Sequence, residues 1–162
     1  EIDDPAVVDL VRALRRRSPS GRLLVCRTPA GWTDIHATDL NGRFKELVGQ
    51  DYSVKDLRTW HGTVLAAAAF VDADPPVNKT VRKRVEAAVM REVSEELGNT
   101  PAVARGSYVD PRVVQAYEKG ITIAASARRA RKGKDDRDDS AAQAILENGT
   151  ATMIRRVARE RQ

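Results

Sequence analysis

The sequence predicts a mainly α-helical fold, with a short strand expected in residues 22–36. In several segments, apolar residues recur every three or four positions, as they do along one face of a helix. Between these segments lie prolines, glycines and small polar residues of the kinds that begin and end helices. Hydrophobic residues make up 41% of the 162 positions, which is enough for an ordinary core and excludes disorder throughout.

The first helix is expected over residues 5–17. Asp4 supplies an N-cap and Pro5 suits the first helical turn. The apolar positions with helical spacing are Val7, Val8, Leu10, Val11 and Leu14. Residues 18–21 end this helix, the apolar run 23–26 predicts the strand, and residues 29–31 predict a turn.

Two further helices are expected before residue 70. Thr38 can cap the first, which Gly49 ends, and Ser53 can cap the second. The apolar positions of the first are Leu40, Phe44, Leu47 and Val48, and those of the second are Val54, Leu57, Val64, Leu65 and Ala68. The second helix is long and ends in the four alanines 66–69.

Residues 74–78 form a stiff connection into a helix with an apolar residue at every fourth position, ended by Gly98. Those positions are Val81, Val85, Val89, Val93 and Leu97. Thr100-Pro101 predicts a brief helix toward Arg105, and Asp110-Pro111 predicts another that ends at Gly120. Tyr108 is therefore expected at the junction of two helices.

The charge pattern changes near the C-terminal end. Five of the seven residues 128–134 are basic, and four of the five residues 135–139 are acidic. Such a mixed-charge run is typical of a linker. We therefore expect a helical domain over 1–125, a charged linker over 126–139, and a C-terminal tail over 140–162 with two short helices, 140–146 and 150–159, sharing a basic face.

Composition narrows the classes of function. The formal charge of +5 suits a polyanionic partner such as nucleic acid, or a well-solvated surface. A single cysteine, Cys26, excludes an internal disulfide and a multi-cysteine metal site, and we expect it to be a buried, inert thiol. No apolar run reaches the length of a membrane span. We expect a cytoplasmic protein with no metal, no cofactor and no membrane partner.

The residues that attract attention have ordinary explanations when each is considered alone. Arg58 follows Leu57, which is expected to face the core, so Arg58 would lie at the edge of the buried face. Asn99 follows the helix-ending Gly98 and is a common capping residue. Tyr108 could simply be a packed core residue.

Taken together, three segments resemble the catalytic domain of bacterial type IB DNA topoisomerases, relatives of the poxvirus enzyme. The segments are KDLRTWHGT at 55–63, LGNTPAVAR at 97–105 and SYVDP at 107–111. The resemblance extends over about residues 1–120, with the segments in the family's order. Agreement at three separate places is far more specific than one short motif.

The resemblance implies a topoisomerase that relaxes supercoiled double-stranded DNA through a transient 3′-phosphotyrosyl link. Tyr108 matches the nucleophile, Arg58 matches a phosphate-binding arginine, and Asn99 matches a second phosphate ligand that is histidine in poxvirus enzymes. Fixed donors of this kind stabilise a transferring phosphoryl group without ATP or metal. Lys55 and Arg105 are candidate contacts to the DNA backbone. His61 does not match a catalytic position, and we expect it to be exposed.

The family also uses an upstream arginine and a general-acid lysine, and this chain begins after both positions. Because the sequence starts without methionine, we expect a fragment whose missing N-terminal part belongs to the same protein. We expect a monomer in the bacterial nucleoid. Two alternatives stay open. A tyrosine recombinase or integrase typically has His-x-x-Arg where this chain has Lys55-x-x-Arg58, and a catalytically inactive DNA-binding module would share the charge.

Overall fold

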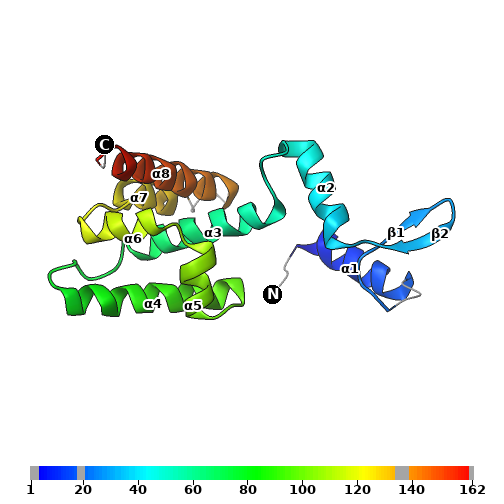
Figure 1. Ribbon diagram of the computed structural model, residues 1–162, viewed down its shortest axis with the longest axis horizontal. Helices are drawn as coiled ribbons and strands as arrows, with labels where there is room; N and C mark the ends of the chain where they lie inside the picture. The colour runs from blue at the N-terminus through cyan, green and yellow to red at the C-terminus, as the bar shows by residue number, and fades with distance from the viewer. Residues whose placement is uncertain (1–3, 18–20, 134–138, 161–162) are drawn as a thin grey trace. The chain divides into compact units, whose positions relative to one another are not determined.

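The computed structural model describes residues 4–17, 21–133 and 139–160 and is mainly α-helical, as predicted (Figure 1). The elements in chain order are α1 (Pro5–Arg17), β1 (Val25–Thr28), β2 (Gly31–Asp34), α2 (Ala37–Val48), α3 (Val54–Ala69), α4 (Lys79–Leu97), α5 (Pro101–Val103), the π-helical turn η1 (Ala104–Tyr108), α6 (Pro111–Glu118), α7 (Ala124–Gly133) and α8 (Asp139–Arg159). The chain divides into two compact units, residues 1–54 (the N-terminal unit) and 55–162 (the C-terminal unit).

In the N-terminal unit, α1 has the predicted bounds. The Asp4 carboxylate accepts hydrogen bonds from the N–H groups of Ala6 (2.8 Å) and Val7 (3.1 Å), which are free donors at a helix start. The predicted strand is β1, and β2 pairs with it as an antiparallel hairpin in the register Val25↔Asp34 to Thr28↔Gly31. The turn predicted at residues 29–31 therefore connects two strands rather than ending one.

Two predictions for the N-terminal unit were wrong. Helix α2 begins after His36, not at a Thr38 cap, because the Asp39 carboxylate accepts the His36 N–H (2.8 Å) and fixes the chain there. Cys26 is exposed rather than buried. Successive residues of a strand face opposite sides, and its neighbour Val25 takes the buried side.

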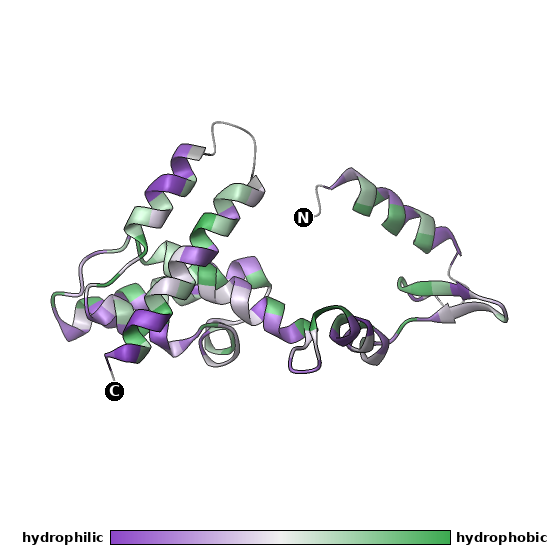
Figure 2. Cartoon of the chain, turned by 90° about the horizontal axis from the view of Figure 1, so that it is seen from above, coloured by the Kyte–Doolittle hydropathy of each residue, from purple (hydrophilic) through white to green (hydrophobic). Residues whose placement is uncertain are grey.

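Apolar residues of the N-terminal unit are largely solvent-exposed. Within residues 4–17 and 21–54, Val25 is the one buried residue. Hydrophobic and hydrophilic residues recur along α1 (Figure 2), yet Leu10 on it is 57% exposed, and Leu47 on α2 is 66% exposed. The sequences of α1 and α2 are therefore amphipathic, but no residue of either helix is buried.

The C-terminal unit holds the hydrophobic core. Helix α4 has its predicted form: the Asn78 side chain accepts the Val81 N–H (2.9 Å), and Gly98 adopts the left-handed conformation at φ 63°. The buried core residues from α3 to α6 include Val64, Ala66, Ala67, Phe70, Val85, Val89, Met90, Val93, Leu97, Ala104, Val109, Val113, Ala116 and Tyr117. Figure 1 shows α7 and α8 on one side of this unit and α4 on the other.

The structure corrects the prediction for the C-terminal segment. Residues 124–133 form α7 instead of belonging to a linker, because Ala127 and Ala130 give the charged segment a small buried face. One continuous helix, α8, replaces the two short ones, and its Met153, Ile154 and Val157 belong to the core rather than to a tail. Residues 134–138 of the expected linker lie outside the described residues. The expected single domain over 1–125 is divided at residue 54.

Gly149 explains why α8 passes through a predicted break. A Cβ built on Gly149 would lie 2.5 Å from the Ser126 Oγ and 2.6 Å from its Cβ. The glycine thus allows α7 and α8 to pack closely, so its role is packing and not helix termination.

Candidate active site

The structure brings Arg58, Asn99 and Tyr108 together at the C-terminal end of α4. The Arg58 guanidinium donates to the carbonyl oxygen of Leu97, and the Asn99 side-chain amide donates to the same oxygen (3.3 Å). The Arg58 Cζ lies 5.0 Å from the centre of the Tyr108 ring, within cation–π range. Three segments separated by about forty and nine residues in sequence thus meet at one place.

The end of α4 explains this arrangement. Carbonyl groups of the last helical turn lack helical partners and form the negative end of the helix dipole, which favours a cation. Gly98 then turns the chain, and its N–H bonds back to Glu95 and Ser94. This turn places Asn99 beside the free Leu97 carbonyl, where the Arg58 side chain also lies.

Leu57 does not support Arg58 in the predicted way. Its side chain is 56% exposed, and the buried face of α3 begins later, at Gly62, Thr63 and Val64. Arg58 is therefore held by the Leu97 carbonyl and the Tyr108 ring rather than by packing beside a core leucine.

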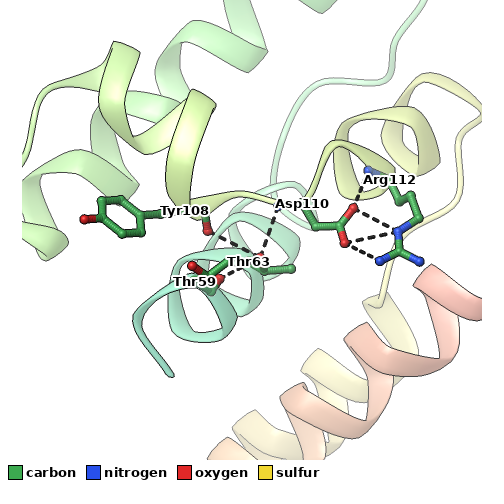
Figure 3. Close-up of polar contacts among 5 residues, drawn as sticks. All are labelled: Thr59, Thr63, Tyr108, Asp110 and Arg112. Atoms are coloured by element: carbon green, nitrogen blue, oxygen red, sulfur yellow. Dashed lines mark hydrogen bonds and ion pairs between the residues drawn. The ribbon is translucent and has the colours of Figure 1, made fainter. Parts of the chain in front are cut away.

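The brief helix expected to end near Arg105 continues as the π-helical turn η1, and Tyr108 is the last residue of that turn. Hydroxyls of α3 hold the segment around Tyr108 (Figure 3). The Thr63 Oγ1 lies 2.7 Å from the Thr59 carbonyl oxygen and 3.3 Å from that of Tyr108, and it accepts the Asp110 N–H (3.1 Å). The Thr59 hydroxyl also lies 3.4 Å from the Ser107 carbonyl oxygen, so one helix carries Arg58 and fixes the tyrosine's backbone.

Gly62 allows the backbone of Tyr108 to approach α3. A Cβ at residue 62 would lie 2.7 Å from the Tyr108 carbonyl oxygen and 3.2 Å from its Cβ. Sequence reasoning missed Gly62 and Thr63. A glycine inside a helical pattern often marks a close approach, and that signal was available at Gly62.

Asp110 anchors the next helix. Its carboxylate caps the helix by accepting a hydrogen bond from the backbone N–H of Arg112 (2.8 Å). The same carboxylate accepts hydrogen bonds from Nε (3.0 Å) and Nη2 (2.5 Å) of the Arg112 side chain (Figure 3). Burial alone would raise the pKa of Asp110. Arg112 outweighs this effect through its side-chain hydrogen bonds, its backbone hydrogen bond and its positive charge, so the pKa of Asp110 is lowered overall. Asp110, two residues after Tyr108, is thus held both by its backbone N–H, which donates to Thr63, and by its carboxylate, which binds Arg112.

The other two tyrosines lie in different surroundings. The buried Tyr117 donates its hydroxyl to the Asp74 carbonyl oxygen (2.7 Å) and stacks on Phe70, with ring centres 4.5 Å apart. Burial and the nearby Asp74 charge raise the Tyr117 pKa. Tyr52 is 57% exposed and belongs to the N-terminal unit.

The remaining candidate residues lie outside the cluster of Arg58, Asn99 and Tyr108. Arg105 forms an ion pair with Glu86 (2.6 Å). Lys55 is exposed in the first turn of α3, and His61 is exposed further along that helix, as expected. Lys55 and Arg105 stay predictions as DNA contacts.

Within the described ranges, no group of three or more His, Cys, Asp or Glu side chains could hold a metal ion, and none of the helices described is long and apolar enough to cross a membrane. No protein-family model matches the chain, and no curated protein matches its sequence. The geometry of the site limits the reactions that it could support. That geometry offers a phenol oxygen, a guanidinium and an amide on adjoining segments.

Proposed function

We propose that this chain supplies the nucleophile and two phosphate ligands of a type IB DNA topoisomerase. The observation that supports the proposal is the meeting of Arg58, Asn99 and Tyr108 at the end of α4. These are the residues that the resemblance implied from the sequence. The contacts of Arg58 with the Leu97 carbonyl and with the Tyr108 ring join residues 39 and 50 positions apart, whereas Asn99 reaches Leu97 within its own turn.

The Leu97 carbonyl oxygen marks the point toward which both donors are directed. Arg58 and Asn99 both donate to it. A non-bridging oxygen of a DNA phosphodiester is a stronger, negatively charged acceptor for the same two groups. The carbonyl therefore stands in for a phosphate oxygen, and small shifts of the two side chains would transfer them to substrate.

The reaction follows from these parts. The Tyr108 oxygen loses its proton and bonds to phosphorus, the bond from phosphorus to the 5′-oxygen breaks, and that oxygen leaves as a 5′-hydroxyl after taking up a proton. Arg58 and Asn99 stabilise the charge on the transferring group in both directions. Rotation of the free strand before religation relaxes the DNA. The exchange conserves the number of phosphodiester bonds and consumes no nucleotide.

Tyr108 suits this role better than the other tyrosines do. The Tyr117 hydroxyl already donates to a backbone carbonyl, and its raised pKa disfavours the phenolate. Tyr52 belongs to the unit that contains neither Arg58 nor Asn99. Tyr108 is half-buried and lies under the Arg58 guanidinium.

The decisive experiment uses DNA in which sulfur replaces the bridging 5′-oxygen. A thiol has a pKa of about 8.5, far below that of an alcohol, so a 5′-thiolate leaves without a general acid. The test therefore does not depend on a general acid and can be made on this chain. Duplexes randomised on the 5′ side of the sulfur remove the need to know a cleavage site.

We expect a covalent protein–DNA adduct that maps to Tyr108 and disappears in Tyr108→Phe. Tyr52→Phe is the matched control and should form the adduct normally. Arg58→Ala should slow adduct formation at least 100-fold, in the range for loss of one transition-state donor. With ordinary DNA, the chain should not relax supercoils at a useful rate. An adduct on Tyr52 or Tyr117, or no adduct at all, would contradict the proposal.

The same substrate separates the alternatives. An inactive DNA-binding module would bind the duplex and form no adduct. A recombinase would form the adduct but would join strands from two partner duplexes, whereas a topoisomerase rejoins the original strand. Because the released 5′-thiol is a poor nucleophile toward phosphorus, labelled acceptor strands with a 5′-hydroxyl, one complementary to each of two duplexes, are then added. Sequencing the joined products distinguishes these outcomes.

A further inference from the structure

A basic groove lies between the start of α7 and the face of α8, apart from the Tyr108 cluster. The first of its two hollows has a volume of about 390 Å³. The polar side chains lining it include Arg129 on α7 and Asn148, Thr152 and Arg156 on α8. Asn148, Thr152 and Arg156 are four residues apart, so they form one stripe along the helix. No Asp or Glu is among the described residues that line this hollow.

A second hollow, of about 510 Å³, shares Thr152 and Arg156 with the first and adds Arg155, Arg159 and Glu160. Glu160 is the acidic residue there, and it is neutralised by Lys119 (2.7 Å) and Arg156 (3.5 Å). Four arginines thus border the two hollows, together with one carboxylate that already has basic partners.

One arginine is fixed in place. The Arg129 Nη2 donates to the Ser126 hydroxyl (3.4 Å), and Ser126 is buried against Gly149 where α7 and α8 touch. Arg129 is therefore held at the wall of the hollow by the helix contact itself. Planar guanidinium groups bind phosphate oxygens in pairs, so this arrangement suits an anion with several oxygens.

The length of the stripe indicates more than one anionic group. Asn148 and Arg156 are eight residues apart, which corresponds to about 12 Å along a helix. A single phosphate could not contact both ends. A chain of phosphates could follow the stripe.

We propose that the α7–α8 groove is a binding site for a run of phosphate groups. The run could come from a nucleic-acid backbone or from a free polyphosphate, and these two sources share the chemistry that the groove recognises. The site goes beyond the proposed reaction and does not depend on it, because none of the groove residues belongs to the cluster of Arg58, Asn99 and Tyr108.

The test measures binding of two probes, inorganic tripolyphosphate and an unmodified duplex, to the whole chain. The variant Arg129→Gln/Arg156→Gln removes two charges from the groove. The matched control, Arg43→Gln/Arg91→Gln, removes two charges from exposed arginines on α2 and α4. All variants also carry Tyr108→Phe, so that adduct formation cannot contribute to binding. Circular dichroism checks that each variant folds.

The groove variant should bind tripolyphosphate at least 10-fold more weakly than the control. If the backbone of DNA occupies the groove, the slope of log affinity against log salt should also fall by about 2, because each lost phosphate contact removes about 0.9. Loss of tripolyphosphate binding alone would identify a free polyphosphate as the ligand. Equal effects of the groove and control variants on both probes would overturn the proposal.

Side-chain NMR locates the ligand directly. Adding tripolyphosphate should shift the Nε–H signals of Arg129 and Arg156 and leave those of Arg43 and Arg91 in place. Shifts of equal size in all four signals would show a general charge effect and would likewise overturn the site. Failure of the adduct experiment would not change either result, so the two proposals fail separately.

Discussion

Both units of this chain are built mainly from helices, but their apolar side chains have different surroundings. In the N-terminal unit, α1 and α2 have 13 and 12 residues, and none of them is buried. In the C-terminal unit, the shorter α6 buries Val113, Ala116 and Tyr117. The difference shows that caps and periodicity define a helix, whereas burial requires partner helices at the right distance.

The residues of both proposed sites lie in the same unit. Arg58, Asn99, Tyr108 and the α7–α8 groove all belong to the C-terminal unit. A rigid core fixes residues from distant segments to within small tolerances, which an uncovered helix cannot do. We therefore expect stability and proposed chemistry to depend on the same residues.

The largest expected effect is a difference in hydrogen exchange between the units. Amides of α4 should exchange through global unfolding, which typically requires about 5–15 kcal/mol. Amides of α1 and α2 should exchange almost as fast as free peptide, because isolated helices of their length are marginal in water. Mass spectrometry of exchanged peptides measures both. Equal protection of α1 and α4 would contradict the comparison and would indicate that something covers α1.

Removing a buried aromatic ring should have the next largest effect. Phe70 is 2% exposed and stacks on Tyr117, so Phe70→Ala should lower the free energy of unfolding by about 3–5 kcal/mol. Trp32→Ala, which removes a 37% exposed ring from the N-terminal unit, is the control and should change it by about 0.5 kcal/mol at most. Urea unfolding followed by circular dichroism provides both values. Similar losses for the two variants would mean that the N-terminal unit has a core of its own.

Two helical glycines should respond to alanine with opposite signs. Gly149→Ala places a methyl group against Ser126 and should destabilise by about 1–2 kcal/mol, because overpacking outweighs the better helix propensity. At Gly42 on α2, an added Cβ meets nothing within 4 Å, so Gly42→Ala should increase helicity through a gain of about 0.5–1 kcal/mol. Thermal melts and the helical dichroism signal measure the two effects. A stabilising Gly149→Ala would show that α7 and α8 do not pack closely.

The smallest expected effect is pH-dependent. Because the folded-state pKa of Asp110 is lowered, its charged form stabilises the fold above the unfolded pKa of about 3.9, and this stability is lost as the pH falls through the folded pKa. Asp110→Asn keeps a capping side chain but loses the charge, so we expect a loss of about 0.5–1 kcal/mol near pH 7. The loss should vanish once Asp110 is protonated in the folded protein.

Asp4→Asn is the control for Asp110→Asn. Asp4 caps α1 in the N-terminal unit, so its replacement should leave the main unfolding transition unchanged at each pH. Denaturant titrations at several pH values measure both variants. A deficit for Asp110→Asn that is independent of pH would show that the Arg112 pair does not stabilise the charged carboxylate.

Features that depend on a few neighbouring residues could be predicted from the amino-acid sequence. Gly98 ends α4, and Asp110-Pro111 begins α6, because caps and proline act within one helical turn. Buried positions at every fourth residue of α4 followed from helical geometry. The three candidate catalytic residues were named through a resemblance, also without tertiary information.

Which residues meet, and which apolar faces are covered, depends on how the helices pack and could not be predicted from the sequence. The expected burial of Leu57 and Cys26, the linker expected where α7 forms and the break expected between residues 146 and 150 were wrong, because periodicity does not identify the partner surface. The shared Leu97 carbonyl, the Thr63 hydroxyl beneath Tyr108 and the close approach at Gly62 join residues about 35–45 positions apart. Such contacts depend on helix packing, which sums over the whole core; of the three, only the close approach at Gly62 has a local signal in the sequence.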